Sequence, residues 1–323
     1  MILAGDIGGT KCNLALFPAG PGRAVAAASA TIASGGHPSF ESVLESFRRD
    51  HPAPVAAAAF GVAGPVVDGV CKTTNLPWTI REASLAERLG TPRVRLLNDL
   101  AATAIGIEWL RDDEVETLQP GAPGARGNRA VIAAGTGLGE AALVADGGRR
   151  IPVPSEGGHA DFAPRDEVEL GLWRWLREAN PRVEYEMVLS GPGIVNLYRF
   201  YHRSEPHPPL WQPGQEKDPE SAAAVSRAAL AGDCPGCRET LERFAAILGA
   251  EAGNLALKVM ATGGVYVAGG IAPKVLPLLR ERHLLDAFRA KGAFTDLMRS
   301  IPVRVVLNAE TALLGAARAA GEL

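Results

Sequence analysis

The sequence predicts an α/β protein of two domains. Strand-like and helix-like segments alternate along the chain, a pattern that favours parallel strands with helices on the sheet faces. The length of 323 residues exceeds the usual size of one domain, and 47% hydrophobic residues are sufficient for a large core. A strand, a glycine turn containing threonine and a second strand open the chain, and the same order recurs from about residue 130, which indicates a second domain of similar architecture.

The first third of the chain is expected to begin with a three-stranded meander. The turn Gly8–Lys11 joins the first two strands, and the apolar run 55–62 has strand length. Apolar residues recur at helical spacing from Phe40 to Phe47, which predicts a helix with one buried face. Strands are expected at 2–7, 13–17, 24–32, 55–62 and 93–98, and helices at 39–48 and 100–110.

The remainder begins with a second pair of strands and then becomes mainly helical. Residues 120–129 and 202–219 are rich in Gly, Pro or polar residues and are predicted to be loops. Strands are expected at 130–134, 140–144, 264–270 and 303–307, and helices at 167–178, 192–201, 221–231, 238–260 and 309–320.

Charge and hydropathy exclude several classes of protein. A net charge of −3 and a pI near 6.1 argue against nucleic acid or an anionic membrane as the main partner. No uninterrupted apolar run approaches the roughly 20 residues that span a membrane. The N-terminus lacks a basic stretch followed by an apolar segment, so a cytoplasmic protein is expected.

The four cysteines do not form a disulfide framework in a chain of this length. Cys234 and Cys237 have CxxC spacing, for which a metal or redox site and the start of a helix are alternatives. The helix start is favoured, because the sequence has neither a second CxxC motif nor a flanking strand of thioredoxin type.

The segment Asp6–Lys11 combines a carboxylate at a strand end with two glycines and a threonine. Glycines allow backbone N–H groups to approach phosphate oxygens, and the carboxylate suits hydrated Mg²⁺. An ordinary hairpin turn explains the segment equally well. The spacing of a Walker A loop is absent.

Gly135-Thr136-Gly137-Leu138-Gly139 is a second loop of the same kind. A dinucleotide-binding fingerprint of this type requires a following helix, whereas residues 140–144 are predicted to be a strand. The dinucleotide-binding interpretation therefore fails on its structural context, and the loop taken alone does not decide between a phosphate site and an ordinary turn.

Asn98 and Asp99 lie at the junction of a predicted strand and helix. Helix capping is favoured locally, and a general base at the mouth of a parallel sheet is the alternative. Glu156 and His159 flank a glycine pair in a segment that is predicted to be non-helical. Asn75 precedes Trp78 in an Asn-Leu-Pro-Trp segment, which suits a sugar hydroxyl and ring but is also common turn chemistry.

Short motifs follow one another through the whole chain. In order they are Asp-x-Gly-Gly-Thr, Gly-Val-Ala-Gly-Pro, Thr-Asn-Leu-Pro-Trp, Asn-Asp, Gly-Thr-Gly-Leu-Gly, Ser-Glu-Gly-Gly-His and Val-Ala-Gly-Gly-Ile. Their order and spacing resemble the bacterial glucokinases of non-ROK type, in the superfamily of sugar kinases, actin and heat-shock-protein ATPases. The resemblance spans residues 3–320.

The resemblance implies an α/β fold with two RNase-H-like domains, each a mixed sheet flanked by helices, around a cleft. Residues 1–110 with about 308–323 would form the smaller domain, and 111–307 the larger one. It further implies glucose and ATP as substrates, Mg²⁺ as the metal, and a homodimer.

Matching positions to the family motifs assigns the site residues. Asp99 would be the catalytic base that accepts the proton of the 6-hydroxyl group. The sugar would contact Asn75, Asn98, Asp99, Glu156, His159 and Glu186. The nucleotide would contact Asp6, Gly8, Gly9, Thr10, Lys11, Gly135, Thr136, Gly137, Gly139, Gly269 and Gly270, with Asp6 holding Mg²⁺ through water.

Two departures concern the ROK branch of sugar kinases. There the matching histidine usually binds zinc with cysteines shortly downstream, but no cysteine lies between His159 and Glu186, so no structural zinc is expected. Lys11 is more typical of ROK members, whereas the run Ser190–Gly193 favours the non-ROK group.

Three alternatives differ in function. A kinase for another hexose or an N-acetylated amino sugar would use the same residue types. A non-enzymatic sugar-sensing regulator would need a DNA-binding module, for which we expect no room ahead of Asp6. An actin- or chaperone-like ATPase would not need the sugar-binding residues.

Overall fold

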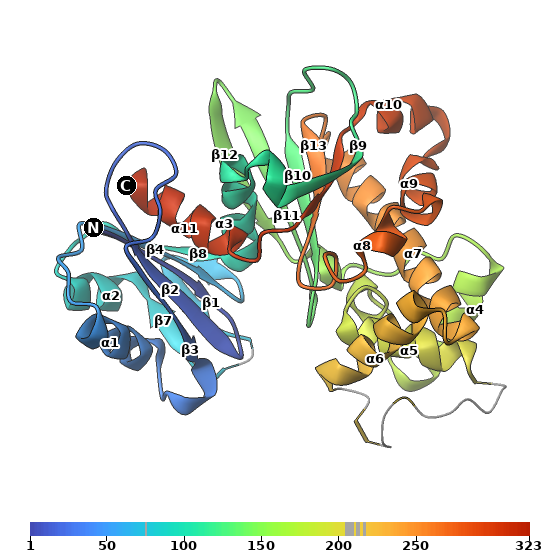
Figure 1. Cartoon of the computed structure of the whole chain (residues 1–323), viewed down its shortest axis with the longest axis horizontal. Coiled ribbons are helices and arrows are strands. Elements are labelled where there is room, and N and C mark those ends of the chain that lie inside the picture. Colours follow the sequence, from blue (N-terminus) through green and yellow to red (C-terminus); the bar gives the residue numbers. More distant parts are fainter. Residues whose placement is uncertain (75, 204–209, 211–213, 216–217) are drawn as a thin grey trace. The chain divides into compact units, whose positions relative to one another are not determined.

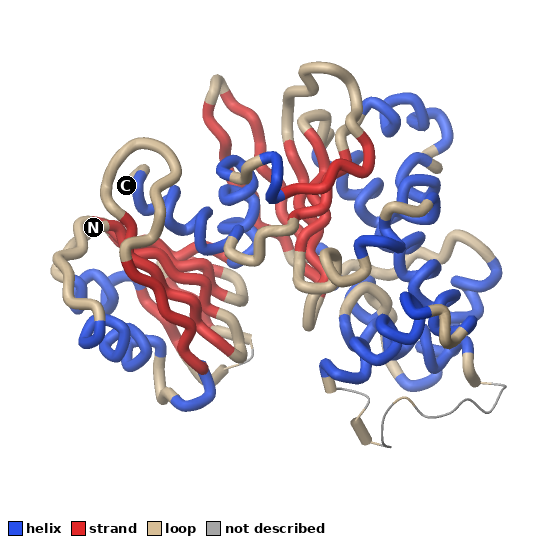
Figure 2. Tube along the Cα trace, in the orientation of Figure 1, coloured by secondary structure: helices blue, strands red, loops and turns tan. Residues whose placement is uncertain are grey.

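The computed structural model describes residues 1–74, 76–203, 210, 214–215 and 218–323 (Figure 1). The chain forms two compact units. The first unit is Met1–Glu114 with Ala141–Pro154 and Asn308–Leu323, and the second is Val115–Glu140 with Ser155–Leu307. Both units combine strands and helices (Figure 2), and the predicted α/β class, with two mixed sheets flanked by helices, is confirmed.

The first sheet has the strand order β3-β2-β1-β4-β8. Its strands are β1 Ile2–Ile7, β2 Lys11–Phe17, β3 Ala28–Ala33, β4 Ala57–Val62 and β8 Val94–Asn98. The first three form the expected antiparallel meander, and β4 and β8 run parallel to β1. Because β4 is buried along its whole length, it reads as the continuous apolar run of a central strand.

Helices cover both faces of this sheet (Figure 1). They are α1 Phe40–Asp50, α2 Glu82–Leu89, α3 Asp99–Gly106 and α11 Thr311–Gly321. The apolar side of α1, which includes Phe40 and Phe47, is fully buried, as its spacing predicts. On the other face, α11 packs on β1, β4 and α3, so the C-terminal helix completes the first unit.

The second sheet has the order β12-β11-β10-β13-β14-β9. Its strands are β9 Val115–Gln119, β10 Arg129–Ala134, β11 Leu138–Asp146, β12 Arg149–Ser155, β13 Gly264–Ala268 and β14 Val303–Val306. Strands β10, β13 and β14 are parallel, and β9 pairs antiparallel with β14 at the edge.

One long helix, α7 Pro235–Val259, packs on β10 and β13. It also contacts the helices α5 Gly191–Tyr201, α6 Pro219–Ala231, α8 Leu276–Leu279 and α9 Arg282–Arg289. The remaining helices of the second unit are α4 Glu167–Ala179, which contacts α5, and α10 Thr295–Ser300, which contacts α9. Cys234 caps α7, because its Sγ accepts the N–H of Cys237 at 3.1 Å. The CxxC segment is thus a helix start, and both cysteines are buried free thiols.

Several elements differ from expectation. The third strand begins at Ala28 instead of residue 24. In the segment before it, Arg23 donates to Trp109 O at 2.9 Å and to Glu114 Oε1 at 2.7 Å. A small sheet of β5 Val66–Val67, β6 Val70–Lys72 and β7 Thr79–Arg81 was not predicted. Within the described part of the chain, no helix is both long and apolar enough to span a bilayer.

Candidate active site

The carboxyl ends of the parallel strands β1, β4 and β8 bring several predicted residues to one edge of the first sheet. Asp6 lies opposite Gly61 on β4, and Asn98 lies opposite Val62 on the same strand. Because β1 and β8 flank β4, Asp6 and the end of β8 are about 10 Å apart, two strand spacings. Asp99 follows at the next position, so the loop after β1 and the candidate base occupy the same edge of the first unit.

Asn98 and Asp99 lie where β8 ends and α3 begins, and the structure shows which of them caps the helix. Asn98 is the N-cap of α3, since its Oδ1 accepts the N–H groups of Leu100 and Ala101 at 3.0 and 3.2 Å. Its Nδ2 donates to Gly64 O at 3.4 Å. Asp99 is the first residue of the helix, is half-buried, and accepts the Leu100 N–H at 2.9 Å. The local preference for capping is thus met by Asn98.

The first glycine loop, Gly8–Thr10, closes the hairpin between β1 and β2. Gly8 N–H donates to Lys11 O at 3.0 Å. Ser34, which is fully buried, supports the loop from behind: its Oγ donates to Gly8 O and its N–H to Thr10 O, both at 2.9 Å. The hairpin interpretation is therefore correct for the backbone, and Thr10 and Lys11 are exposed on it.

Asp6 lies at the base of this loop. Burial raises the pKa of its carboxyl group, while a hydrogen bond from Asn13 Nδ2 at 3.3 Å and the charge of Lys11 lower it. Asn13 is directly opposite Asp6 in the β1–β2 register. Burial disfavours the ionised form of Asp6, and the positive charge of Lys11 favours it. A further cation next to Asp6 would therefore stabilise its carboxylate.

The second glycine loop, Gly135–Gly139, lies in the second unit and, like the first, is closed by a backbone hydrogen bond within the turn. Gly135 N–H donates to Gly137 O at 2.8 Å, and Gly135 O accepts the N–H of Gly191, the first residue of α5, at 2.8 Å. The N–H of Leu138 donates to Glu186 Oε2 at 2.9 Å. The loop is thereby held between a helix start and one of the predicted sugar-binding carboxylates.

Gly269 and Gly270 follow β13, the neighbour of β10. Gly269 has φ +86°, and a Cβ on it would lie 2.7 Å from the carbonyl carbon of Ala134, so only glycine fits. Ile271 N–H donates to Ala134 O at 3.2 Å. The predicted adenosine segment therefore adjoins the residue immediately before the second glycine loop.

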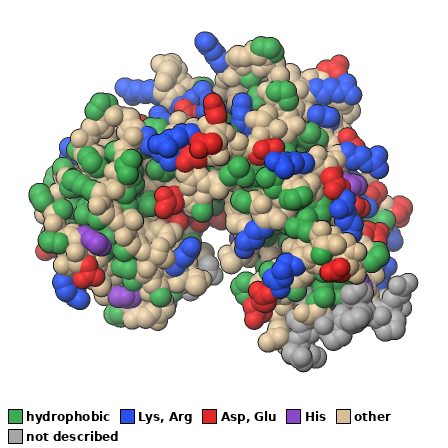
Figure 3. All heavy atoms as spheres, in the orientation of Figure 1, with side chains coloured by type: hydrophobic (Ala, Val, Ile, Leu, Met, Phe, Trp, Pro, Cys, Tyr) green, Lys and Arg blue, Asp and Glu red, His purple; other side chains and the backbone are tan. Residues whose placement is uncertain are grey.

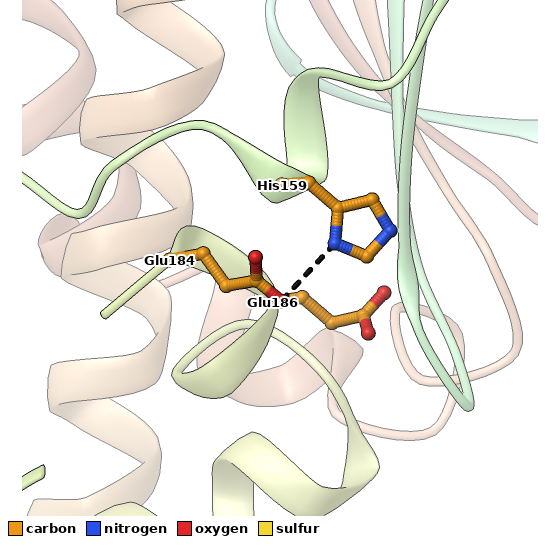
Figure 4. A group of neighbouring side chains, drawn as sticks. All are labelled: His159, Glu184 and Glu186. Atoms are coloured by element: carbon orange, nitrogen blue, oxygen red, sulfur yellow. Dashed lines mark hydrogen bonds and ion pairs between the residues drawn. The ribbon is translucent and has the colours of Figure 1, made fainter. Parts of the chain in front are cut away.

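His159, Glu184 and Glu186 form a cluster in the second unit (Figure 4). His159 Nδ1 lies 3.1 Å from Glu184 Oε1, and one ligand atom from each of the three residues lies within 4.8 Å of the others. The hydrogen bond to Glu184 raises the pKa of His159, and the charges of Glu186 and Glu156 act in the same direction, against the effect of partial burial. The imidazole therefore holds a proton more readily than a free histidine does.

Glu156 and His159 belong to the Ser155–His159 loop. Its end is a 3₁₀ turn, Gly157–His159, in place of the fully irregular segment expected. His159 N–H donates to Glu156 O at 3.0 Å, and Glu156 is exposed. The remaining predicted sugar contact, Asn75, lies outside the described residues.

The sequence did not reveal two of the residues that hold the site. Ser34 acts on a loop 26 positions before it, and Glu184 reaches His159 across 25 positions. The only available signal for Glu184 was a second acid two residues before Glu186. On the face seen in Figure 3, acidic and basic side chains are intermixed over the surface.

Comparison with known proteins identifies the family. The family model for glucokinase matches residues 3–323. A glucokinase of Synechocystis sp. is 41% identical, covering 99% of this chain and 98% of that protein. The crystal structure of a glucokinase from an Antarctic psychrotroph has a TM-score of 0.86 at 30% identity, covering 100% and 99% of the two chains. A glucokinase from Balamuthia mandrillaris in complex with glucose shares the fold, with a TM-score of 0.77 at 22% identity over 99% and 93% of the chains. This chain belongs to the bacterial glucokinase family, outside the ROK branch.

Proposed function

We propose that this protein transfers the γ-phosphoryl group of ATP to the 6-hydroxyl group of D-glucose, with Asp99 as the general base. The observation that carries the proposal is the position of Asp99. It begins α3 at the sheet edge that also carries the first glycine loop and Asp6, in a chain of the glucokinase family.

The position of Asp99 supports its assignment as the base. Its neighbour Asn98 is the N-cap of α3, and Asp99 is the first residue of that helix. Phosphoryl transfer depends mainly on placing the acceptor oxygen in line and removing its proton as the bond forms. A positioned carboxylate typically contributes about 10²–10⁴-fold to such a step.

The two glycine loops would hold the nucleotide phosphates, with Gly269 and Gly270 beside the adenosine. The buried carboxyl group of Asp6 fits a hydrated Mg²⁺ ion, because its ionised form gains from a nearby cation and Mg²⁺ accepts a single carboxylate with several waters. When bound, Mg²⁺ neutralises charge on the transferred phosphate. Thr10 and Lys11, which are exposed on the loop, would contact the phosphate oxygens.

The sugar would be recognised by Asn98, Asp99, Glu156, His159 and Glu186, together with Asn75. Fixed carboxylates and an imidazole would discriminate between epimers, because a misplaced hydroxyl leaves a polar partner unpaired. Asn98 has a second amide hydrogen that it can donate to a hydroxyl.

A coupled ADP-release assay tests the substrate. Glucose, mannose, fructose, N-acetylglucosamine and N-acetylmannosamine are compared at equal concentration with Mg·ATP. The proposal predicts the highest kcat/KM for glucose. A higher kcat/KM for another sugar would show that glucose is not the preferred substrate. ATP hydrolysis at a rate that does not depend on any added sugar would exclude a sugar kinase. Imidazole and carboxylate groups are also zinc ligands. The same assay is therefore repeated with a zinc chelator, which is expected to leave the rate unchanged. Sedimentation of the same sample tests the proposed homodimer.

A further inference from the structure

Glu140 is the most unusual buried acid of the second unit. It follows the second glycine loop on β11, and its side chain is 1% exposed. Among the described residues, no hydrogen-bond partner reaches its Oε1. A buried polar atom without a partner is costly, so its presence calls for a reason beyond packing.

The carboxyl group lies directly against the Ser155–His159 loop. A Cβ built on Gly157 would lie 2.8 Å from Glu140 Cδ and closer still to Oε2. A side chain at this position would require the Glu140 carboxyl group to move. Gly157 N–H also donates to Ser155 Oγ at 2.9 Å, so the backbone above Glu140 forms a tight turn.

Charged residues of α7 also act on Glu140. Glu251, which is fully buried, accepts from Lys258 Nζ at 3.2 Å and from Asn254 Nδ2 at 2.7 Å. Burial and the charge of Glu251 raise the pKa of Glu140 to about 7, and Lys258 acts in the opposite direction. Glu251 thus has direct hydrogen-bond and ion-pair partners, whereas burial favours the neutral form of Glu140.

We propose that Glu140 is a positioning residue for sugar binding: its neutral carboxyl group supports Gly157 and thereby holds Glu156 and His159 in place. The inference rests on the proposed function, since it assigns a purpose to the loop that carries two sugar-binding residues. When Glu140 ionises, its negative charge is repelled by Glu251 and requires hydration. Water that enters to hydrate the carboxylate would displace the Ser155–His159 loop. The charged groups that act on it are Glu251 and Lys258 from α7, while Ser155 and Gly157 on the loop side carry no charge.

The first test compares Glu140→Gln with the wild type. KM for glucose and kcat are measured from about pH 6 to about pH 8.5, a range that covers the titration. Wild-type KM is expected to rise with pH about threefold or more relative to that of Glu140→Gln, because the amide has the same shape and never ionises. The kcat ratio stays constant. Glu178→Gln, an exposed substitution on α4, is the matched control and should follow the wild type.

The second test is a double-mutant cycle between Glu140→Ala and Gly157→Ala. Gly157→Ala alone is expected to lower the thermal midpoint and raise KM, because its methyl group meets the Glu140 carboxyl. In the Glu140→Ala background the methyl group occupies vacated space, so both effects shrink. Additive effects, or parallel KM profiles for wild type and Glu140→Gln, would overturn the inference. If the wild type does not phosphorylate glucose, the proposed function fails, but the coupling in thermal midpoint still tests the contact.

Discussion

Replacing Glu140 by Gln should change how stability depends on pH. The pKa of this carboxyl group is raised from 4.5 to about 7 in the folded protein, mainly by burial. At about 1.4 kcal/mol per pKa unit, this shift corresponds to about 3 kcal/mol. The folded state binds the proton more tightly than the unfolded state, so this stabilising contribution is complete below the unfolded pKa and is lost as pH rises through about 7. In the Gln variant the side-chain amide at this position does not ionise, so the variant does not lose this contribution to stability as pH rises.

The assay is denaturant unfolding at about pH 5 and pH 8, either side of this titration. Trp173 and Trp175 on α4 report on the second unit by fluorescence. The difference in unfolding free energy, variant minus wild type, should increase by up to about 3 kcal/mol from the lower to the higher pH. Titration of all other groups is common to both proteins and cancels. A difference that is the same at both pH values would refute the reasoning.

Three further substitutions separate the roles of individual residues. Ser34→Ala removes the hydroxyl that holds the first glycine loop; it should cost about 1 kcal/mol of stability and raise KM for ATP, and an unchanged KM would remove the supporting role. Asn98→Ala should lose about 1 kcal/mol with its helix cap, whereas Asn98→Asp keeps the cap; if Asn98→Asp also keeps full glucose affinity, the amide does not bind the sugar. Glu184→Gln should lower the pKa of His159 in an NMR titration, because the hydrogen bond between them is the main cause of its rise, and an unshifted titration would contradict that cause.

The sequence revealed those parts of the site that have local signals. Glycines with a threonine at strand ends located both glycine loops, and the Asn98–Asp99 pair marked a strand–helix junction. The structure adds which residue does what there: Asn98 accepts two N–H groups of α3, and Asp99 starts the helix. Composition alone does not decide between two adjacent capping residues.

Contacts across many residues were not predictable. Ser34 reaches Gly8 from a short 3₁₀ turn, and Glu140 lies under Gly157 although a lone acid on a strand resembles a solvent-facing residue. The small β5–β7 sheet has strands of two and three residues, too short to show any periodicity. The fold class followed from repeated patterns, whereas these details depend on tertiary packing.

The central claim is that Asp99 removes the proton from the sugar hydroxyl. The direct measurement is the single-turnover rate of glucose phosphorylation by Asp99→Asn, with glucose affinity measured by calorimetry on the same sample. The account predicts that the rate falls about 100-fold or more while the glucose Kd changes less than about tenfold. A variant that binds glucose normally and retains more than a few per cent of the wild-type rate would contradict it.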